Sequence, residues 1–216
     1  MRYGIASEGW VFIVPAALLA VAALAAGFWV VGIILAVLAL FLLSFFRDPR
    51  LTPGQSHDEV LSPADGTVVR VGALESSPWE GLTQQISIFM SVFDVHVNRA
   101  PVTGEIIHYT YQPGAKGNAM SDKSSEDNEQ NLIVMRDDQG RVLAFKQIAG
   151  LLARRIVFDL AEGDRAERGT RIGMIRFGSR VDVFLPPEAK IAVSMREKVR
   201  VGRTVLATFG QGRESE

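Results

Sequence analysis

The chain has 216 residues, with 23 Lys and Arg against 24 Asp and Glu, a net charge of -1, and no cysteine. A chain of this length builds one good core, with or without an appendage. The balanced charge argues against nucleic acid as a partner, because nucleic-acid-binding domains carry a basic excess. The lack of cysteine excludes a disulfide framework of the kind that exported proteins carry.

The first distinctive feature is residues 9–46, which contain no Asp, Glu, Lys, Arg or His. A membrane-spanning helix takes about 20 apolar residues, so this stretch is too long for one helix and nearly long enough for two. Because Gly27 and Gly32 favour a reversal, we predict a helical hairpin made of Val11–Ala26 and Val30–Phe46. A cleaved signal peptide fits less well, since its apolar region has only about 7 to 15 residues.

Basic residues flank the apolar stretch on both sides. Arg2 precedes it, and Arg47 and Arg50 follow it. Since cytoplasmic flanks of membrane segments are enriched in Lys and Arg, both ends are expected in the cytoplasm. We therefore predict a membrane anchor with the start of a linker in residues 1–50, in the cell (inner) membrane, and a domain on the cytoplasmic side in residues 51–216.

After the polar linker, short apolar runs alternate with turn residues, which is typical of β-structure. The fold class is therefore predicted as α+β, a mainly β domain behind an N-terminal helical hairpin. Gly150–Leu160 fits a helix or a further strand, and the polar segment Gly114–Asn131 is expected to form a long loop or short helices over a site. The predicted strands are Gly66–Val71, Gln85–Met90, Gly104–Tyr111, Asn131–Arg136, Val142–Ile148, Arg171–Arg176, Val181–Leu185 and Arg203–Thr208.

Gly178 and Ser179 lie in the middle of the apolar stretch Met174–Pro186, where a glycine weakens a strand. The G-x-S-x-G elbow of a serine hydrolase is absent. The alternative chemistry is attack by Ser179 Oγ on the Gly178 carbonyl carbon, which gives an ester. Elimination then cuts the chain and leaves a dehydroalanine that hydrolyses to a pyruvoyl group. Glycine suits the residue before such a cut because it tolerates strained backbone and lets the oxygen approach.

The motifs "LSPADGTVV", "FDVHVNRAPVTGEI", "NEQN" and "RFGSRVDVFLP", behind a hydrophobic N-terminus, resemble the short form of phosphatidylserine decarboxylase, a pyruvoyl-dependent membrane enzyme. The resemblance covers most of the chain from Leu61 onward. It implies decarboxylation of phosphatidylserine in the membrane to phosphatidylethanolamine, with a pyruvoyl cofactor made from Ser179. It also implies self-cleavage between Gly178 and Ser179, into a large subunit of residues 1–178 and a small subunit of residues 179–216.

The resemblance also implies roles for single residues. The pyruvoyl ketone forms a Schiff base with the headgroup amine, and His96 is the expected acid that protonates the resulting carbanion, because a histidine titrates near neutral pH. Asp65 matches the acidic member of the self-processing group, as base for Ser179 or as the residue that holds His96. Asn128 and Glu129 match a further motif, for which a structural or loop-gating role is expected.

Arg99 departs from the pattern of many longer family members, which carry a second histidine at this position, three residues after the first. An arginine stays protonated and cannot act as a base at neutral pH, so the proton acceptor for self-cleavage stays open. Two roles remain for Arg99: substrate binding, through the lipid phosphate or carboxylate, or polarisation of the Gly178 carbonyl.

Two other functions remain open from the residues alone. One is a non-catalytic, membrane-anchored adaptor with a lipoyl-like domain, suggested by the similar turn-and-strand patterns "SPADGTVV" and "APVTGEII". The other is a membrane serine protease with Ser179 as an intact nucleophile. The sequence contains no cluster with metal-ligand spacing and no Gly-rich phosphate loop, so no metal or nucleotide is expected. A homo-oligomer is compatible with the sequence but not indicated by it.

Overall fold

The computed structural model describes residues 3–49, 56–74, 76–114, 128–150, 156–176 and 179–210. The chain divides into two compact units, Met1–Arg50 and Leu51–Glu216. As predicted, the described chain is mainly β with two N-terminal helices. Most of the predicted loop at Gly114–Asn131 lies outside the described residues, as does the first half of Gly150–Leu160.

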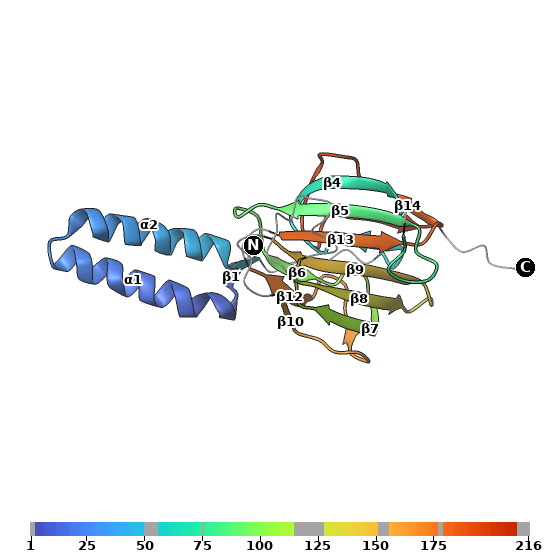
Figure 1. Cartoon of the computed structure of the whole chain (residues 1–216), viewed down its shortest axis with the longest axis horizontal. Helices are drawn as coiled ribbons and strands as arrows, with labels where there is room; N and C mark the ends of the chain where they lie inside the picture. Colours follow the sequence, from blue (N-terminus) through green and yellow to red (C-terminus); the bar gives the residue numbers. More distant parts are fainter. Residues whose placement is uncertain are drawn as a thin grey trace, which may run out of the picture. The chain divides into compact units, whose positions relative to one another are not determined.

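The N-terminal unit is an antiparallel helical hairpin (blue in Figure 1). Its helices begin and end within one residue of the predicted bounds. Gly27 makes the reversal between them with φ of 84°, a left-handed conformation that glycine adopts without strain. Two short strands pair at the base of the hairpin, so its two ends leave together. The elements are β1 (Tyr3–Ile5), a 3-10 turn (Ser7–Gly9), α1 (Trp10–Ala25), α2 (Trp29–Phe45) and β2 (Arg47–Pro49).

The two helices are apolar around most of their circumference. Within the described residues, one helical segment, Ser7–Ala25, is long and apolar enough to cross a membrane, and the 17-residue Trp29–Phe45 is a shorter apolar helix. Large side chains such as Leu18 and Ile34 are 65% and 62% exposed. Exposed apolar surface of this extent is typical of sites that contact a membrane or another protein.

The second unit is built from short strands joined by turns. Its strands are β3 (Glu59–Leu61), β4 (Gly66–Ala73), β5 (Gln84–Met90), β6 (Val97–Arg99), β7 (Gly104–Gln112), β8 (Gln130–Asp137), β9 (Val142–Ala149), β10 (Ile156–Phe158), β11 (Arg165–Ala166), β12 (Arg171–Ile175), β13 (Ser179–Leu185), β14 (Ala189–Ile191), β15 (Lys198–Val199) and β16 (Val205–Phe209).

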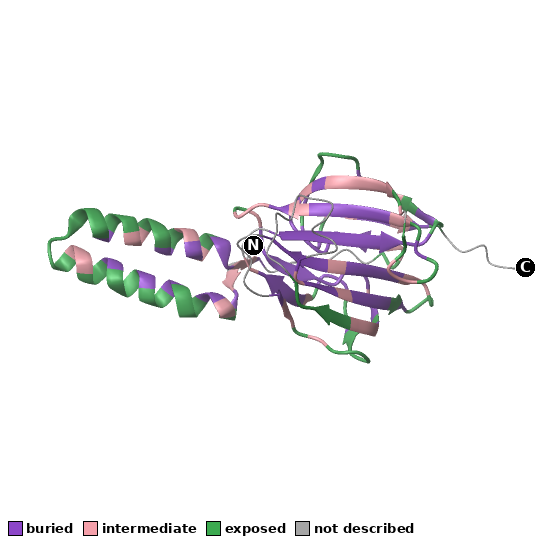
Figure 2. Cartoon of the chain, in the orientation of Figure 1, coloured by how far each residue is buried: buried purple, intermediate pink, exposed green. Residues whose placement is uncertain are grey.

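An antiparallel eight-stranded sheet, in the order β11-β7-β8-β9-β13-β5-β4-β15, dominates the unit (Figure 1). Two three-stranded sheets, β10-β12-β6 and β14-β16-β3, accompany it. Strand β13 lies near the middle of the large sheet and pairs along its length with β5 on one side and β9 on the other. All seven residues of β13 are buried (Figure 2).

The main core contains side chains from all three of these sheets, so the two small sheets pack on one face of the large one. Val181 and Val183 point into this core, as the two-residue period of a strand requires. Phe184, on the opposite face of β13, packs in a smaller cluster with Leu82 and Ala144. Both faces of β13 are therefore covered.

The apolar stretch Met174–Pro186 is divided between two strands, as the separate strands predicted at Arg171–Arg176 and Val181–Leu185 require, and the second strand begins two residues earlier than predicted. Strand β12 ends at Ile175 in a three-stranded sheet, and β13 begins at Ser179 in the eight-stranded sheet. The serine therefore begins a strand, at the point where the chain passes from one sheet to another.

Candidate active site

Ser179 is fully buried at the first position of β13. Its register partners are Met90 at the end of β5 and Ala149 at the end of β9. Its Oγ donates a hydrogen bond to Met90 Sδ at 3.3 Å. A thioether is a weak acceptor, so among the described residues the printed hydrogen bond of this hydroxyl is a weak one. Its neighbour Gly178 lies outside the described residues.

Asn128 and Glu129 hold the strand end that faces Ser179. Asn128 is buried, and its Nδ2 donates to the Ala149 carbonyl at 2.7 Å. The Ala149 amide in turn donates to the Glu129 carbonyl at 2.9 Å. Both polar groups of the residue beside Ser179 therefore have fixed partners, which fits the expected structural role of this motif.

His96 follows the loop that leaves β5. Ser91 donates to Asp94 Oδ2 through both its amide and its hydroxyl, each at 2.8 Å, and this fixes the turn. His96 is fully buried, its Nδ1 lies 3.0 Å from the Asp94 carbonyl, and its own carbonyl accepts from the Ile175 amide at 3.3 Å. Because a carbonyl only accepts, this contact assigns a proton to Nδ1.

Asp65 is buried at the turn before β4. Its Oδ1 accepts from the Val201 amide at 2.6 Å and its Oδ2 from the Val95 amide at 3.4 Å. Burial raises the pKa of Asp65 above its usual value of 3.8, and the two backbone hydrogen bonds partly oppose that rise. Asp65 thus touches the residue before His96 and holds a proton more readily than an exposed aspartate does.

Gly66 directly follows Asp65 and is the first residue of β4. A Cβ there would collide with the Phe89 carbonyl oxygen of the neighbouring strand. The close approach of β4 to β5 at this point therefore requires a residue without a side chain.

Arg99 is a buried residue of β6. Its Nη1 donates to the Gly169 carbonyl at 2.9 Å, and its amide donates to the Pro63 carbonyl at 3.1 Å. One end of the guanidinium is thus bonded to the chain itself.

The predicted residues gather around one strip of chain. The segment 61–65 lies beside residues 95–101. Three hydrogen bonds join them: the Val95 amide to Asp65, the Arg99 amide to the Pro63 carbonyl, and the Leu61 amide to the Pro101 carbonyl. Ser179 reaches this strip through Met90, just before the loop to His96. Within the described part of the chain, Ser179 Oγ bonds to Met90 and not to His96 or Asp65.

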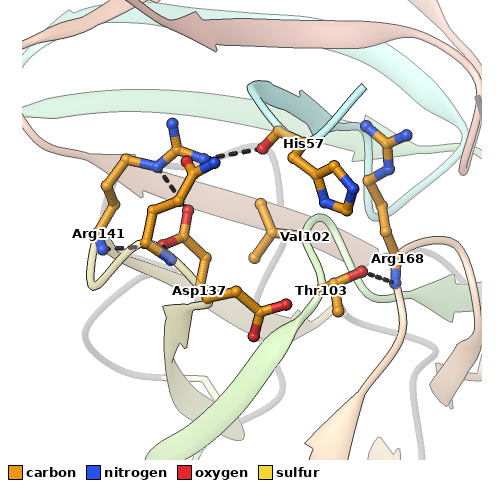
Figure 3. A pocket seen from close by; sticks show the side chains of 8 residues that line it. His57, Val102, Thr103, Asp137, Arg141 and Arg168 are labelled. Atoms are coloured by element: carbon orange, nitrogen blue, oxygen red, sulfur yellow. Dashed lines mark hydrogen bonds and ion pairs between the residues drawn. The ribbon is translucent and has the colours of Figure 1, made fainter. Parts of the chain in front are cut away.

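A charged pocket lined by described residues is drawn in Figure 3. The strand register puts its residues Asp137 and Arg141 at the opposite ends of the strands from Ser179. Arg141 binds Asp137 Oδ2 at 2.6 Å and Asp58 Oδ1 at 2.8 Å, and its guanidinium lies 4.2 Å from the centre of the Phe209 ring. Arg168 donates to the carbonyl of Ser56. These bonds fix the chain at residues 56–59 onto the sheet. Among the described residues, no group of three or more His, Cys, Asp or Glu could hold a metal ion.

Comparison with known proteins decides the family. The family model for phosphatidylserine decarboxylase matches residues 38–207. The phosphatidylserine decarboxylase proenzyme of Pelobacter propionicus is 44% identical over 95% of this chain and 97% of its own length. That of Nitrosomonas eutropha is 44% identical over 95% of both chains, and that of Erythrobacter litoralis is 48% identical over 83% of this chain and 77% of its own. The chain belongs to the phosphatidylserine decarboxylase family.

Three residues that lie near Ser179 in this phosphatidylserine decarboxylase were not identified from the sequence. The sequence does not mark Met90 as a site residue, because a single methionine at the end of an apolar strand is typical of the hydrophobic core. Arg180 and Asp182, on the opposite face of β13 from Ser179, form a buried ion pair with Nε to Oδ1 at 2.9 Å. Their i, i+2 spacing in a strand was the available signal, since it places both side chains on one face.

Proposed function

We propose that this chain is a self-cleaving, membrane-attached decarboxylase that converts phosphatidylserine to phosphatidylethanolamine with a pyruvoyl group made from Ser179. The observation that carries the proposal is the position of Ser179, buried at the first residue of a central strand with apolar partners on both sides. Membership of the decarboxylase family supports the substrate and the reaction.

The surroundings of Ser179 fit a pyruvoyl group. The group is no larger than the serine residue that it replaces. Strands β5 and β9, which pair with β13 from residue 179 onward, hold this position in the sheet after the bond between residues 178 and 179 is cut. Formation of the group balances as follows: Ser179 Oγ takes the acyl group of Gly178 from nitrogen, elimination releases that acyl group as a free carboxylate, and hydrolysis of the dehydroalanine releases ammonia. No outside oxidant or reductant is needed.

The residues around the group have separate roles. The pyruvoyl carbonyl supplies an acceptor for the electron pair released when carbon dioxide leaves. His96, with Nδ1 fixed by the Asp94 carbonyl, holds the transferable proton at Nε2 and delivers it to the substrate carbon. Asp65, with its raised pKa, is the candidate acceptor of the Ser179 proton during self-cleavage. Arg99 is the candidate for contact with an anionic group of the lipid.

The decisive experiment is mass spectrometry of the purified protein. We expect two pieces of 178 and 38 residues. The smaller piece should be blocked to N-terminal sequencing and lighter by one ammonia than a peptide that begins with serine, because it carries a ketone where serine has its amine. Ordinary proteolysis at the same bond would leave a free serine amine. Ser179→Ala should stay whole, and an intact wild-type chain with full activity would leave the adaptor and protease functions as the alternatives.

We further propose that the hairpin inserts into the cytoplasmic side of the cell membrane. Helices of 16 and 17 residues are about 25 Å long, close to the roughly 30 Å of the hydrocarbon layer. Trp10 near the base and Trp29 at the turn lie where aromatic residues meet the two interfaces. Deletion of residues 1–46 should therefore reduce activity on liposomes much more than activity on a short-chain, soluble substrate; equal losses would indicate a folding role.

A further inference from the structure

Three buried side-chain amides form a continuous line through the core. Asn131 Nδ2 donates to Gln147 Oε1 at 2.7 Å, and Gln147 Nε2 donates to Asn98 Oδ1 at 2.7 Å. Asn98 Nδ2 then donates to the Pro63 carbonyl at 3.2 Å. None of the three amides has any exposed surface. Burial of amides is costly unless every partner is in place, so a line of this kind fixes one arrangement of the strands that carry it.

The central bond of this line joins two different sheets. Gln147 belongs to β9 of the eight-stranded sheet, and Asn98 belongs to β6 of the sheet β10-β12-β6. The rest of the shared core is apolar contact, which has no direction. A hydrogen bond between side chains has both a direction and a length. The bond from Gln147 to Asn98 therefore defines how one sheet lies over the other at this point.

The two strands that it joins are the neighbours of the strands on either side of the predicted cut. Strand β12, which ends three residues before Gly178, pairs with β6, with Gly173 opposite Asn98. Strand β13, which begins at Ser179, pairs with β9, with Val181 opposite Gln147. The bond thus sets the separation between the end of β12 and the start of β13.

Met90 brings the same line close to the reacting hydroxyl. Met90 Sδ accepts the hydrogen bond of Ser179 Oγ at 3.3 Å and lies 4.0 Å from Asn98 Nδ2. Asn98 therefore contacts the side chain that orients Ser179, in addition to fixing the strand β6.

We propose that Asn98 and Gln147 are positioning residues for self-cleavage, and that their hydrogen bond places Ser179 Oγ relative to the carbonyl that it attacks. The proposal rests on the proposed function. Intramolecular attack is sensitive to geometry, and a misplacement of about 1 Å can cost about 100-fold in rate. Loss of the bond should therefore slow the cut out of proportion to any loss of stability.

The test compares the same substitution at two buried glutamines. Gln147→Met removes the bond between the sheets. Gln85→Met is the matched control: Gln85 is buried in β5, the other neighbour of β13, and its Nε2 donates to Ser87 Oγ in its own strand at 2.9 Å. Each full chain is made by cell-free translation, and the release of the 38-residue piece is followed with time. We expect Gln147→Met to cleave at least about 10-fold more slowly than wild type and Gln85→Met to cleave at close to the wild-type rate.

Two further measurements separate geometry from stability. Melting temperatures of both variants are taken in the uncut Ser179→Ala background, so that each change in cleavage rate can be compared with the change in stability. The exchange variant Asn98→Gln with Gln147→Asn keeps the combined side-chain length and should recover part of the rate. If Gln147→Met does not fold, the exchange variant is compared with wild type instead.

The outcomes are distinct. Slow cleavage in Gln147→Met, normal cleavage in Gln85→Met and recovery in the exchange variant support the proposal. Wild-type cleavage in folded Gln147→Met, or equal slowing in both glutamine variants, overturns it and leaves the proposed function intact. An uncut wild-type chain removes the proposed function, and this proposal with it.

Discussion

The strands of the eight-stranded sheet have different interactions at their two ends: Ser179 lies at one end of the strands, and the pocket around Arg141 lies at the other. At one end, Ser179 lies among a thioether, backbone amides and buried side-chain amides. At the other end, Arg141 and Arg168 bind carboxylates and carbonyls around an open pocket (Figure 3). The charged end holds residues 56–59 on the sheet, whereas the printed partner of the Ser179 hydroxyl, among the described residues, is a methionine thioether. For chemistry that a chain performs on its own backbone, the placement of the strands on either side of the cut decides whether the hydroxyl can reach the carbonyl.

The largest effect expected at the Ser179 end is that of His96→Ala. Cleavage and decarboxylation are separate steps, so the variant should still yield the 178- and 38-residue pieces at least in part. Its turnover on phosphatidylserine should fall by about 100- to 10,000-fold, the usual contribution of a general acid. Carbon dioxide release per mole of cut protein measures this directly, and wild-type turnover in the cut variant would exclude His96 as the acid.

A smaller effect, confined to acid pH, is expected from Asp65. Its raised pKa means that the carboxylate is lost on acidification at a higher pH than for an ordinary aspartate. If Asp65 accepts the Ser179 proton, the rate of self-cleavage falls as the pH falls through that raised pKa.

The stability of the uncut chain should change in the opposite direction over the same range. A folded-state pKa above the unfolded one means that the folded form binds the proton more tightly, so Asp65 contributes stability at low pH that is lost as the pH rises. Urea titrations of the Ser179→Ala chain from pH 3 to 7, set beside cleavage rates over the same range, check both signs. Parallel curves would argue against Asp65 as the base.

The smallest effect on chemistry is expected at the pocket end. Arg141→Met leaves the Asp137 carboxylate, whose side chain is only 5% exposed, without its charged partner, and should cost about 2 kcal/mol of unfolding free energy. Cleavage and turnover of the folded variant should match wild type. A loss of turnover larger than the loss of folded protein would break the contrast between the two ends and give the pocket a functional role.

Local patterns predicted much of this fold. The strand predicted at Gly104–Tyr111 differs from β7 by one residue at one end, and the hairpin helices are each displaced by one residue. Alternation and continuous apolar runs are properties of neighbouring residues, so they are visible in the sequence. Strand β6 was missed because three residues give no period, although it lies inside the motif that contains His96 and Arg99.

The site was less predictable than the fold, because its contacts join distant parts of the chain. Asn98 and Gln147 are 49 residues apart, and Met90 is 89 residues from Ser179. Nothing local marks an asparagine in a short strand as the partner of a glutamine in another sheet. The family resemblance supplied His96, Asp65 and Ser179 as candidates, and their roles stay predictions.

The pairing of β13 with strands from before the proposed cut affects how the cut protein unfolds and refolds. Three described strands after the proposed cut pair with strands from before it: β13 with β5 and β9, β15 with β4, and β16 with β3. The fourth, β14, pairs with β16. The two pieces are therefore interleaved, and dilution alone should not separate them. Folding of the whole chain is a first-order process, but once the cut protein has been denatured its recovery needs a collision between two pieces, so its yield should depend on concentration. The cut protein would therefore refold less readily than the uncut chain. The lifetime of the active, cut protein would then depend on its rate of unfolding.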